Sequence, residues 1–289
     1  MELGWAIHPY WQIRSSISEA RYWLDQILAL DPSPSPLRAK LLGLASDYSS
    51  FQGEYETAGR FEDEGLQISR ALGDEEGVYY SMDGLAMLAG MQGDYVRAAE
   101  LLEQTLVYRR GGNDIARLAS TINNLAIASR RCGNLERARD LYEEAVTMSR
   151  PTQNQYLLAH LLTGLAEVHA DLGEHAASLG FLQESLSLVH KLGNTDQVVN
   201  TLEALASLFC QFGAVELAIQ LASASSKTRI EIGVPHSLAV RAEVDEFISR
   251  LRVKVRQKEF EKAWSRGDAM PLSQAVELAL SEKYFPGAG

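Results

Sequence analysis

The sequence has little cysteine. Cys132 and Cys210 are the two cysteines in 289 residues, and they lie far apart without C-x-x-C spacing. This number and spacing argue against a disulfide framework and indicate a reduced, intracellular protein.

Basic charge is also scarce, and it is scattered. The chain has 27 Lys and Arg against 38 Asp and Glu, for a net charge of −11, and the basic stretch from Arg250 to Lys262 is broken by Glu259 and Glu261. No cluster of cations forms a face that would neutralise several phosphates, so direct nucleic-acid binding and binding to anionic membranes are not expected.

Long apolar runs and a signal peptide are missing as well. No uninterrupted apolar stretch approaches the ~18 residues that a membrane-spanning helix needs. The N-terminus has no basic segment before the aromatic residues Trp5 to Trp11 and no small-residue cleavage site. These features predict a cytoplasmic protein.

The residues that are abundant favour helices. Hydrophobic residues make up 46% of the chain and aromatics 8%, and the eight prolines mostly fall between periodic segments. This composition suits amphipathic helices packed through Leu and Ala, and it predicts an all-α fold.

A repeat of 40 residues runs through the sequence. Glycine-centred turns recur at this spacing, and a second series of turns is offset from the first by 20 residues, which indicates two helices per repeat. The glycines of the first series are Gly53, Gly93, Gly133, Gly173 and Gly213. The second series is centred on Gly73, Asn113, Gln153, Gly193 and Gly233.

Small residues recur in the same register. Five residues after each glycine of the first series stands Ala58, Ala98, Ala138, Ser178 or Ala218. At these positions the second helix of a repeat is expected to cross the first closely. Because one such hairpin cannot bury its apolar face alone, neighbouring hairpins must stack.

The pattern divides the chain into three parts. Residues 1–36 are expected to form a degenerate N-terminal hairpin that begins with an aromatic helix from Trp5 to Ile13. Residues 37–233 hold five repeats. After Pro235 the period ends, and residues 234–289 are predicted to be capping helices and a tail, with a short helix after Pro271.

Together, the Leu-Ala pairs of the first helices, the turns QGEY and QGDY, the Ala five residues on and the helix end Asp31-Pro32 resemble tetratricopeptide repeats in a 40-residue form. The resemblance covers nearly the whole chain and implies an α-solenoid with a right-handed superhelix. The segments WQIRSSISEARYWLDQILALDP, QGDYVRAAELLEQTL and EFEKAWSRGDAMPLSQAVELAL are further similar to the C-terminal region of bacterial regulatory ATPases of the STAND class, which include relatives of the maltose-regulon activator.

In STAND proteins a nucleotide-binding module precedes the repeats, which act as a sensor or an oligomerisation platform, and the resemblance implies a similar role here. The present sequence departs from the full-length pattern. It contains no G-x-x-x-x-G-K-[ST] loop, so no ATP site of that type is expected within it, and no helix-turn-helix follows the repeats. The chain is thus expected to be either a fragment of a regulator or a free-standing array.

Motifs for catalysis or metal binding are lacking. His160, His169, His175 and His190 lack the i, i+3 or i+4 spacing of helical metal ligands, so neither a metal nor another cofactor is expected. No G-x-S-x-G motif is present, and neither cysteine matches a nucleophile motif. A non-enzymatic protein is predicted; the proximity of Glu167, Asp171 and His169 is all that supports a hidden catalytic site.

The resemblance implies that the first helices of the repeats line a concave face. Asn123 and Asn124 would hold a ligand's backbone there, and Arg130 and Arg131 would pair with a carboxylate. The alternative is that these side chains are a merely solvated face. The repeat register places these candidate binding residues on the face: Tyr80, Asp83, Met87, Ser120, Asn123, Asn124, Ile127, Arg130, Arg131, His160, Thr163, Glu167, Asp171, Asn200, Glu203 and Ser207.

The chaperone-type carboxylate clamp is not expected, because His160 and Gly164 stand where that clamp needs basic residues. We therefore predict a scaffold that binds a protein, a peptide or a small-molecule inducer, as the sensor domain of a STAND-type transcriptional regulator. The alternative is a free-standing adaptor or peptide-pheromone receptor that self-associates. The sequence leaves the oligomeric state open.

Overall fold

The computed structural model describes residues 17–234, 236 and 238–281, and all regular structure in these ranges is α-helical. The all-α class predicted from the sequence is confirmed. The expected helix from Trp5 to Ile13 and the last eight residues of the expected cap lie outside the described residues. The helices are α2 Ile17–Leu30, α3 Pro36–Phe51, α4 Tyr55–Leu72, α5 Glu75–Gln92, α6 Tyr95–Arg110, α7 Ile115–Arg131, α8 Leu135–Ser149, α9 Gln155–Asp171, α10 His175–Leu192, α11 Thr195–Gln211, α12 Val215–Ile232, α13 Leu238–Lys254, α14 Gln257–Ala269 and α15 Leu272–Leu280.

The glycines of the 40-residue register end helices. All five glycines of the first series have φ between 80° and 88°. At Gly93, this left-handed conformation lets the next amide, that of Asp94, donate to the carbonyl of Ala89 at 2.9 Å, which closes the end of α5. Only glycine adopts this backbone without a steric penalty, so its recurrence sets where one helix of each hairpin stops.

Short polar side chains start several of the following helices. Asp94 accepts a hydrogen bond from the amide of Arg97 at 3.0 Å, and Asn194 accepts one from the amide of Gln197 at 2.8 Å. Asp74 and Asn154 do the same at the starts of α5 and α9. These N-caps satisfy amides that the helix itself leaves unpaired.

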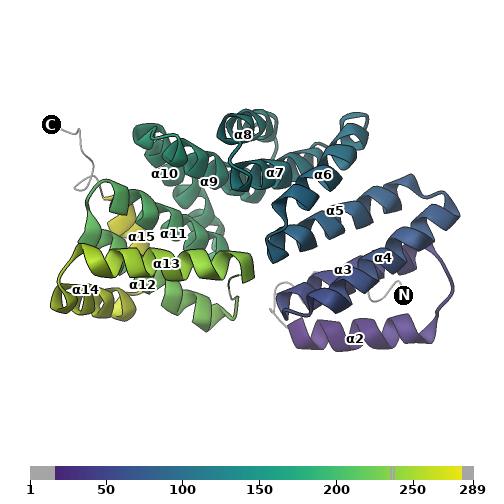
Figure 1. The fold of residues 1–289 in the computed structure, drawn as a ribbon, viewed down its shortest axis with the longest axis horizontal. Coiled ribbons are helices and arrows are strands. Elements are labelled where there is room, and N and C mark those ends of the chain that lie inside the picture. The colour runs from purple at the N-terminus through teal and green to yellow at the C-terminus, as the bar shows by residue number, and fades with distance from the viewer. Residues whose placement is uncertain (1–16, 235, 237, 282–289) are drawn as a thin grey trace. The chain divides into compact units, whose positions relative to one another are not determined.

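The chain divides into two compact units. Unit 1 comprises residues 1–114 and 236–239, and unit 2 comprises residues 115–235 and 240–289. Unit 1 contains the hairpins α3–α4 and α5–α6, and unit 2 contains α7–α8, α9–α10 and α11–α12 (Figure 1). Within each unit neighbouring hairpins pack on one another, and one apolar cluster of unit 2 continues through the hairpins α9–α10 and α11–α12.

The small residues of the register are buried where helices cross. Ala58, Ala98, Ala138, Ser178 and Ala218 are all at most 3% exposed. A larger residue at these positions would push the two helices of a hairpin apart.

The regular stack of unit 2 is followed by α14, which packs against α12. Ser223 donates a hydrogen bond to the carbonyl of Trp264 at 2.8 Å, and Lys227 donates one to the carbonyl of Asp268 at 2.7 Å. Gly267 lies so close to the backbone of Gln220 that a Cβ would overlap its carbonyl. The helix α13 therefore does not take the next place in the stack, although it comes first in sequence.

Candidate functional site

The candidate binding residues fall in both units. Tyr80 and Asp83 lie on α5 in unit 1, and the others, apart from Met87, lie on α7, α9 and α11 in unit 2.

In unit 1, Asp83 is held by an arginine that the sequence did not single out. Arg109, near the end of α6, is 6% exposed and donates to Asp83 at 3.2 Å and to both carboxylate oxygens of Glu76 at 2.8 Å. Burial lowers the pKa of Arg109, but the hydrogen bond to Glu76 and the charge of Asp83 outweigh burial and raise it. Asp83 thus ties the two helices of its hairpin together.

Tyr80 packs on the preceding hairpin. Its ring edge lies against Gly43 of α3, where a Cβ would come within 2.6 Å of a ring carbon. The tyrosine is half-buried. Its aromatic ring fills a space that a glycine leaves between two first helices.

Two carboxyl groups, those of Glu62 and Asp47, lie inside unit 1, and Glu62 is close enough to Asp83 to feel its charge. Glu62 of α4 is 1% exposed, one of its oxygens has no hydrogen-bond partner, and its carboxylate occupies the space above Gly84. Burial, and then the charge of Asp47, raise the pKa of Glu62 to about 8. Burial also raises the pKa of Asp47 to about 7. These groups hold protons near neutral pH.

In unit 2, Arg130 joins two first helices. It donates from Nε to Asp171 at 2.6 Å and from Nη1 to Glu167, both on α9. Burial lowers the pKa of Arg130, whereas Glu167 and Asp171 more than offset this and raise it. The structure therefore brings three of the candidate residues together in one ion-pair network.

Tyr142 lies beneath this network. It is 2% exposed, and its ring occupies the space above Gly164, whose Cβ would overlap the phenol. Burial, and then the charge of Glu167, raise the pKa of Tyr142. This position is two 40-residue periods after Glu62, and Gly164 is two periods after Gly84.

The two asparagines of α7 differ in exposure. Asn123 is 5% exposed and donates to the side-chain oxygen of Asn124 at 3.1 Å, while its own oxygen has no partner and is buried. Asn124 and Ile127 are half-buried and lie on the same side of the helix, three residues apart. Asn124 is the more accessible of the pair.

Thr163 belongs to a buried cluster of hydroxyl groups. It is 7% exposed, and its hydroxyl lies 2.8 Å from that of Ser185 and 3.2 Å from that of Thr201. The cluster joins α9, α10 and α11, so Thr163 acts inside the stack. His160, one turn earlier, is half-buried with its Nδ1 at 3.2 Å from Gln197.

Asn200 and Glu203 share one arginine. Arg229 of α12 is 8% exposed and donates to Glu203 at 2.9 Å from Nε and at 2.8 Å from Nη2, and it also binds Asn200. Asp196 lies 3.6 Å from the same guanidinium. Both candidate residues are therefore part of an ion-pair network within the hairpin α11–α12.

This network repeats the one in unit 1. Arg229, Asp196 and Glu203 each follow Arg109, Glu76 and Asp83 by three periods of 40 residues. We name each set a hairpin clasp. Aligning the second helices in the 40-residue register would have revealed both arginines, which the sequence reading missed because it followed the first helices alone.

Arg131 contacts a helix beyond the repeats. It forms an ion pair with Glu243 of α13, and the two side chains are 26% and 46% exposed. The other candidates with polar side chains, Ser120 and Ser207, are exposed and half-buried, and Met87 in unit 1 is half-buried. Arg131 thus differs from the other candidates, because its ion-pair partner Glu243 lies on a helix that is not part of a repeat hairpin.

The histidines are held by structural contacts. His169 is 8% exposed, its Nδ1 lies 2.5 Å from Glu174, and its ring lies 5.3 Å from that of Phe181. His175 meets the ring of Phe212 edge-on at 5.4 Å. Among the described residues, no three His, Cys, Asp or Glu side chains are placed to hold a metal ion.

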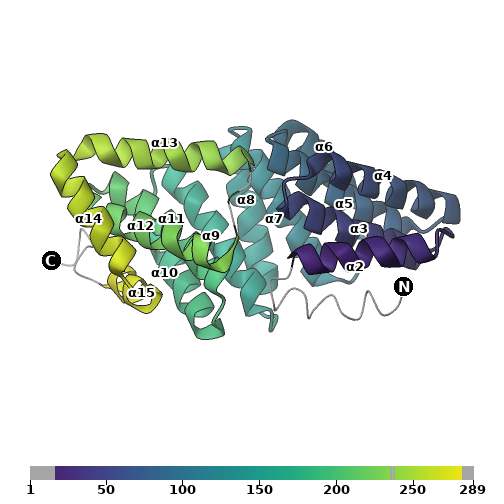
Figure 2. The same cartoon turned by 90° about the horizontal axis from the view of Figure 1, so that it is seen from below.

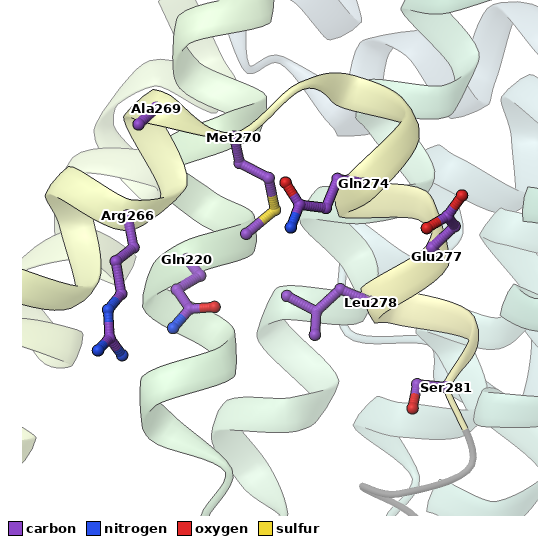
Figure 3. A pocket seen from close by; sticks show the side chains of 8 residues that line it. All are labelled: Gln220, Arg266, Ala269, Met270, Gln274, Glu277, Leu278 and Ser281. Atoms are coloured by element: carbon purple, nitrogen blue, oxygen red, sulfur yellow. The ribbon is translucent and has the colours of Figure 1, made fainter.

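A shallow pocket of about 650 Å³ lies at the C-terminal end of unit 2 (Figure 3). Its walls come from α12, α14 and α15 and combine the aliphatic Met270 and Leu278 with the polar Gln220, Arg266 and Gln274. The pocket contains none of the candidate binding residues. In the described part of the chain, no helix has both the length and the apolarity to cross a membrane.

The stacked helical hairpins define an α-solenoid, as the sequence predicted. Two sequence models of the tetratricopeptide repeat match the chain, one at residues 118–150 and the other at residues 81–104 and 159–184. The tetratricopeptide repeats expected from the sequence are therefore confirmed, and repeats of this kind are protein-binding scaffolds. Curated proteins gave no sequence match.

Solved structures of similar fold include three proteins of different kinds. A Rap protein complexed with competence and sporulation factor is 12% identical, with a TM-score of 0.67 over 90% of this chain and 79% of that one. A STAND protein with a tetratricopeptide repeat sensor from Pyrococcus horikoshii is 15% identical, with a TM-score of 0.60 over 94% of this chain and 42% of that one. BtubC from P. vanneervenii is 18% identical, with a TM-score of 0.57 over 77% of this chain and 91% of that one. At these identities the likeness shows the fold.

Proposed function

We propose that the chain is a non-enzymatic scaffold that binds a protein or peptide on the first-helix face of unit 2. The observation that carries this proposal is Arg131, a guanidinium at the end of α7 whose described partner is a partly exposed carboxylate from outside the repeats. Asn124 and Ile127 lie one to two turns before it on the same helix and add an amide and an apolar contact. Tyr80 and Asp83 remain predicted contacts in unit 1.

The ion pairs of this face suit a binding role. The guanidiniums of Arg130 and Arg229 are already neutralised by acids of the neighbouring helices, so these residues shape the face and keep it rigid. A rigid face binds with little loss of conformational entropy. Partner selection then falls to the half-buried side chains at the surface.

The biological setting that we propose is the sensor domain of a bacterial STAND-type transcriptional regulator in the cytoplasm. The structural likeness to a STAND protein with a tetratricopeptide repeat sensor supports this setting. The second candidate is a free-standing peptide receptor, which the likeness to a Rap protein complexed with competence and sporulation factor favours. The reading frame upstream of the codon for Met1 separates them, because a nucleotide-binding module encoded there would support the sensor and contradict the receptor.

The binding face is tested with a partner identified by photo-crosslinking from position 124. Titration of that partner into the double variant Asn124→Ala, Arg131→Glu should give an affinity about tenfold lower than wild type, because one amide contact is lost and one charge is reversed. The matched control is Asn134→Ala, Arg137→Glu, which makes the same changes at exposed positions at the start of α8. Equal affinities for wild type and the Asn124, Arg131 variant would contradict the assignment.

A further inference from the structure

Among the described helices of unit 2, α13 has the fewest buried side chains. From Val240 onward it belongs to unit 2, yet most of its side chains are exposed and only Leu251 is fully buried. Phe247 and Ile248 pack half-buried against the core cluster that Leu251 joins. Figure 2 shows α13 running across the row of helices, whereas the helices of the hairpins lie alongside one another.

The buried and half-buried side chains of α13 lie along one stripe. Val244, Phe247, Ile248 and Leu251 follow the i, i+3, i+4, i+7 spacing of an amphipathic helix face. Phe247, Ile248 and Leu251 reach a core cluster built from residues of α9 to α12, together with α14 and α15. The apolar side of α13 therefore packs on the core cluster of unit 2.

The N-terminal half of α13 is fixed by charge. Glu243 pairs with Arg131 at the end of α7, the first helix of unit 2. An ion pair between two partly exposed side chains adds little stability. This contact therefore orients α13 on unit 2 but contributes little to the free energy of its attachment.

We propose that α13 is an internal ligand of unit 2, which a partner displaces with an amphipathic helix of the same pattern. The partner helix carries an acidic residue that takes the place of Glu243 on Arg131, followed by apolar residues at the spacing of Val244, Phe247 and Leu251. This inference rests on the proposed function, because it names the class of partner for the same face. Release of α13 is the conformational change that binding produces.

The closed position is tested first, by hydrogen exchange of the α13 amides in the full chain. Glu243→Arg should speed their exchange about fivefold, since attraction to Arg131 becomes repulsion. The matched control Glu246→Arg makes the same charge change at an exposed position on the same helix and should leave exchange unchanged. Adding Arg131→Glu to Glu243→Arg restores an ion pair and should restore slow exchange. Equal exchange in the Glu243 and Glu246 variants would overturn the proposal.

Binding is tested with a fluorescein-labelled synthetic peptide of residues 240–254, followed by anisotropy. The Glu243→Arg chain should bind it about fivefold more tightly than wild type, in proportion to the faster opening. A peptide with Arg at the position of Glu243 should bind the Arg131→Glu chain and not the Glu243→Arg chain, which a merely structural α13 would not produce. Circular dichroism of each variant checks that the helices are intact.

The outcomes separate this inference from the proposed function. If the peptide binds no variant, or binds all of them equally, while the Asn124, Arg131 variant still loses the crosslinked partner, the internal ligand is wrong and the binding face stands. If the peptide behaves as expected while partner affinity is unchanged in that variant, the binding face is wrong and the internal contact stands.

Discussion

Units 1 and 2 place side chains of different polarity at the same position of the 40-residue repeat. In unit 1 the carboxylate of Glu62 fills the space above Gly84, and in unit 2 the phenol ring of Tyr142 fills the space above Gly164. The two pairs stand two 40-residue periods apart. The repeat thus fixes where a large side chain of the second helix meets a glycine of the next first helix, but it does not fix the polarity of that side chain.

The largest expected effect on stability comes from removing the aromatic ring of Tyr142. Tyr142→Ala removes a buried ring above Gly164 and should lower the free energy of unfolding of unit 2 by about 4 kcal/mol, because Gly164 has no side chain to fill the cavity. Amide exchange of α8 and α9 measures the change.

Tyr142→Phe is the matched control, because it keeps the ring and removes the hydroxyl. It should lower the free energy of unfolding by about 1 kcal/mol or less. A loss as large as that of Tyr142→Ala would mean that the hydroxyl, and not the packing of the ring, stabilises this junction.

The acidic side of the comparison predicts a pH dependence confined to unit 1. The native pKa of Glu62, about 8, lies above its ordinary value of 4.5, so the folded chain holds a proton that the unfolded chain releases. The stabilisation is complete below pH 4.5 and is lost as the pH rises through 8. Relative to Glu62→Gln, wild-type unit 1 should lose about 1.4 kcal/mol of unfolding free energy per pH unit, or about 4 kcal/mol between pH 5 and pH 9.

The measurement is amide exchange of α4 and α5 between pH 5 and pH 9, corrected for the intrinsic rate. Glu56→Gln, an exposed change on the same helix, should keep the wild-type slope. The prediction fails if the Glu62→Gln and wild-type slopes agree, or if α8 and α9 in unit 2 show the same loss.

The smallest expected effect on stability comes from disrupting the hairpin clasp, which both units contain. Arg109→Met and Arg229→Met each remove the centre of a hairpin clasp and leave two carboxylates without it. Because these acids are partly exposed and regain water, each change should cost about 2 kcal/mol, less than the loss of a fully buried ion pair.

Exchange of α5–α6 and of α11–α12 measures these two costs. Arg139→Met, at a more exposed ion pair on α8, is the control and should change stability by about 0.5 kcal/mol or less. If the two substitutions lower the free energy of unfolding by very different amounts, the two clasps do not stabilise their hairpins equally, despite their equivalent positions in the repeat.

The periodic features could be predicted from the sequence. Gly93 and its counterparts mark helix ends because the left-handed turn requires glycine, and Ala138 and its counterparts mark helix crossings because only small residues fit there. Both signals are local, and each repeats five times. The all-α solenoid follows from them.

The partners of the candidate residues could not be predicted in the same way. The ion pairs of Asp83, Glu203 and Arg130 depend on residues 26 to 41 positions away, on helices whose rotation about their axes the periodicity does not fix. Thr163 occupies a first-helix position of the register, yet it turns into the stack because Ser185 and Thr201 offer hydroxyl partners there. Side-chain pairing between neighbouring hairpins therefore decides which polar residues reach the surface.

The close contact of α14 with α12 at Gly267 also limits how copies of this protein can associate. A stack of identical hairpins ends in a surface that matches its own beginning, so an uncovered end favours head-to-tail growth into a filament. Here Gly267 of α14 lies at backbone distance from Gln220 of α12, and Ala263 on the same helix is buried, so α14 covers this side of α12 from within the chain. We expect a bulky residue in place of Gly267 to displace α14, uncover that side of α12 and favour head-to-tail association, which sedimentation would detect.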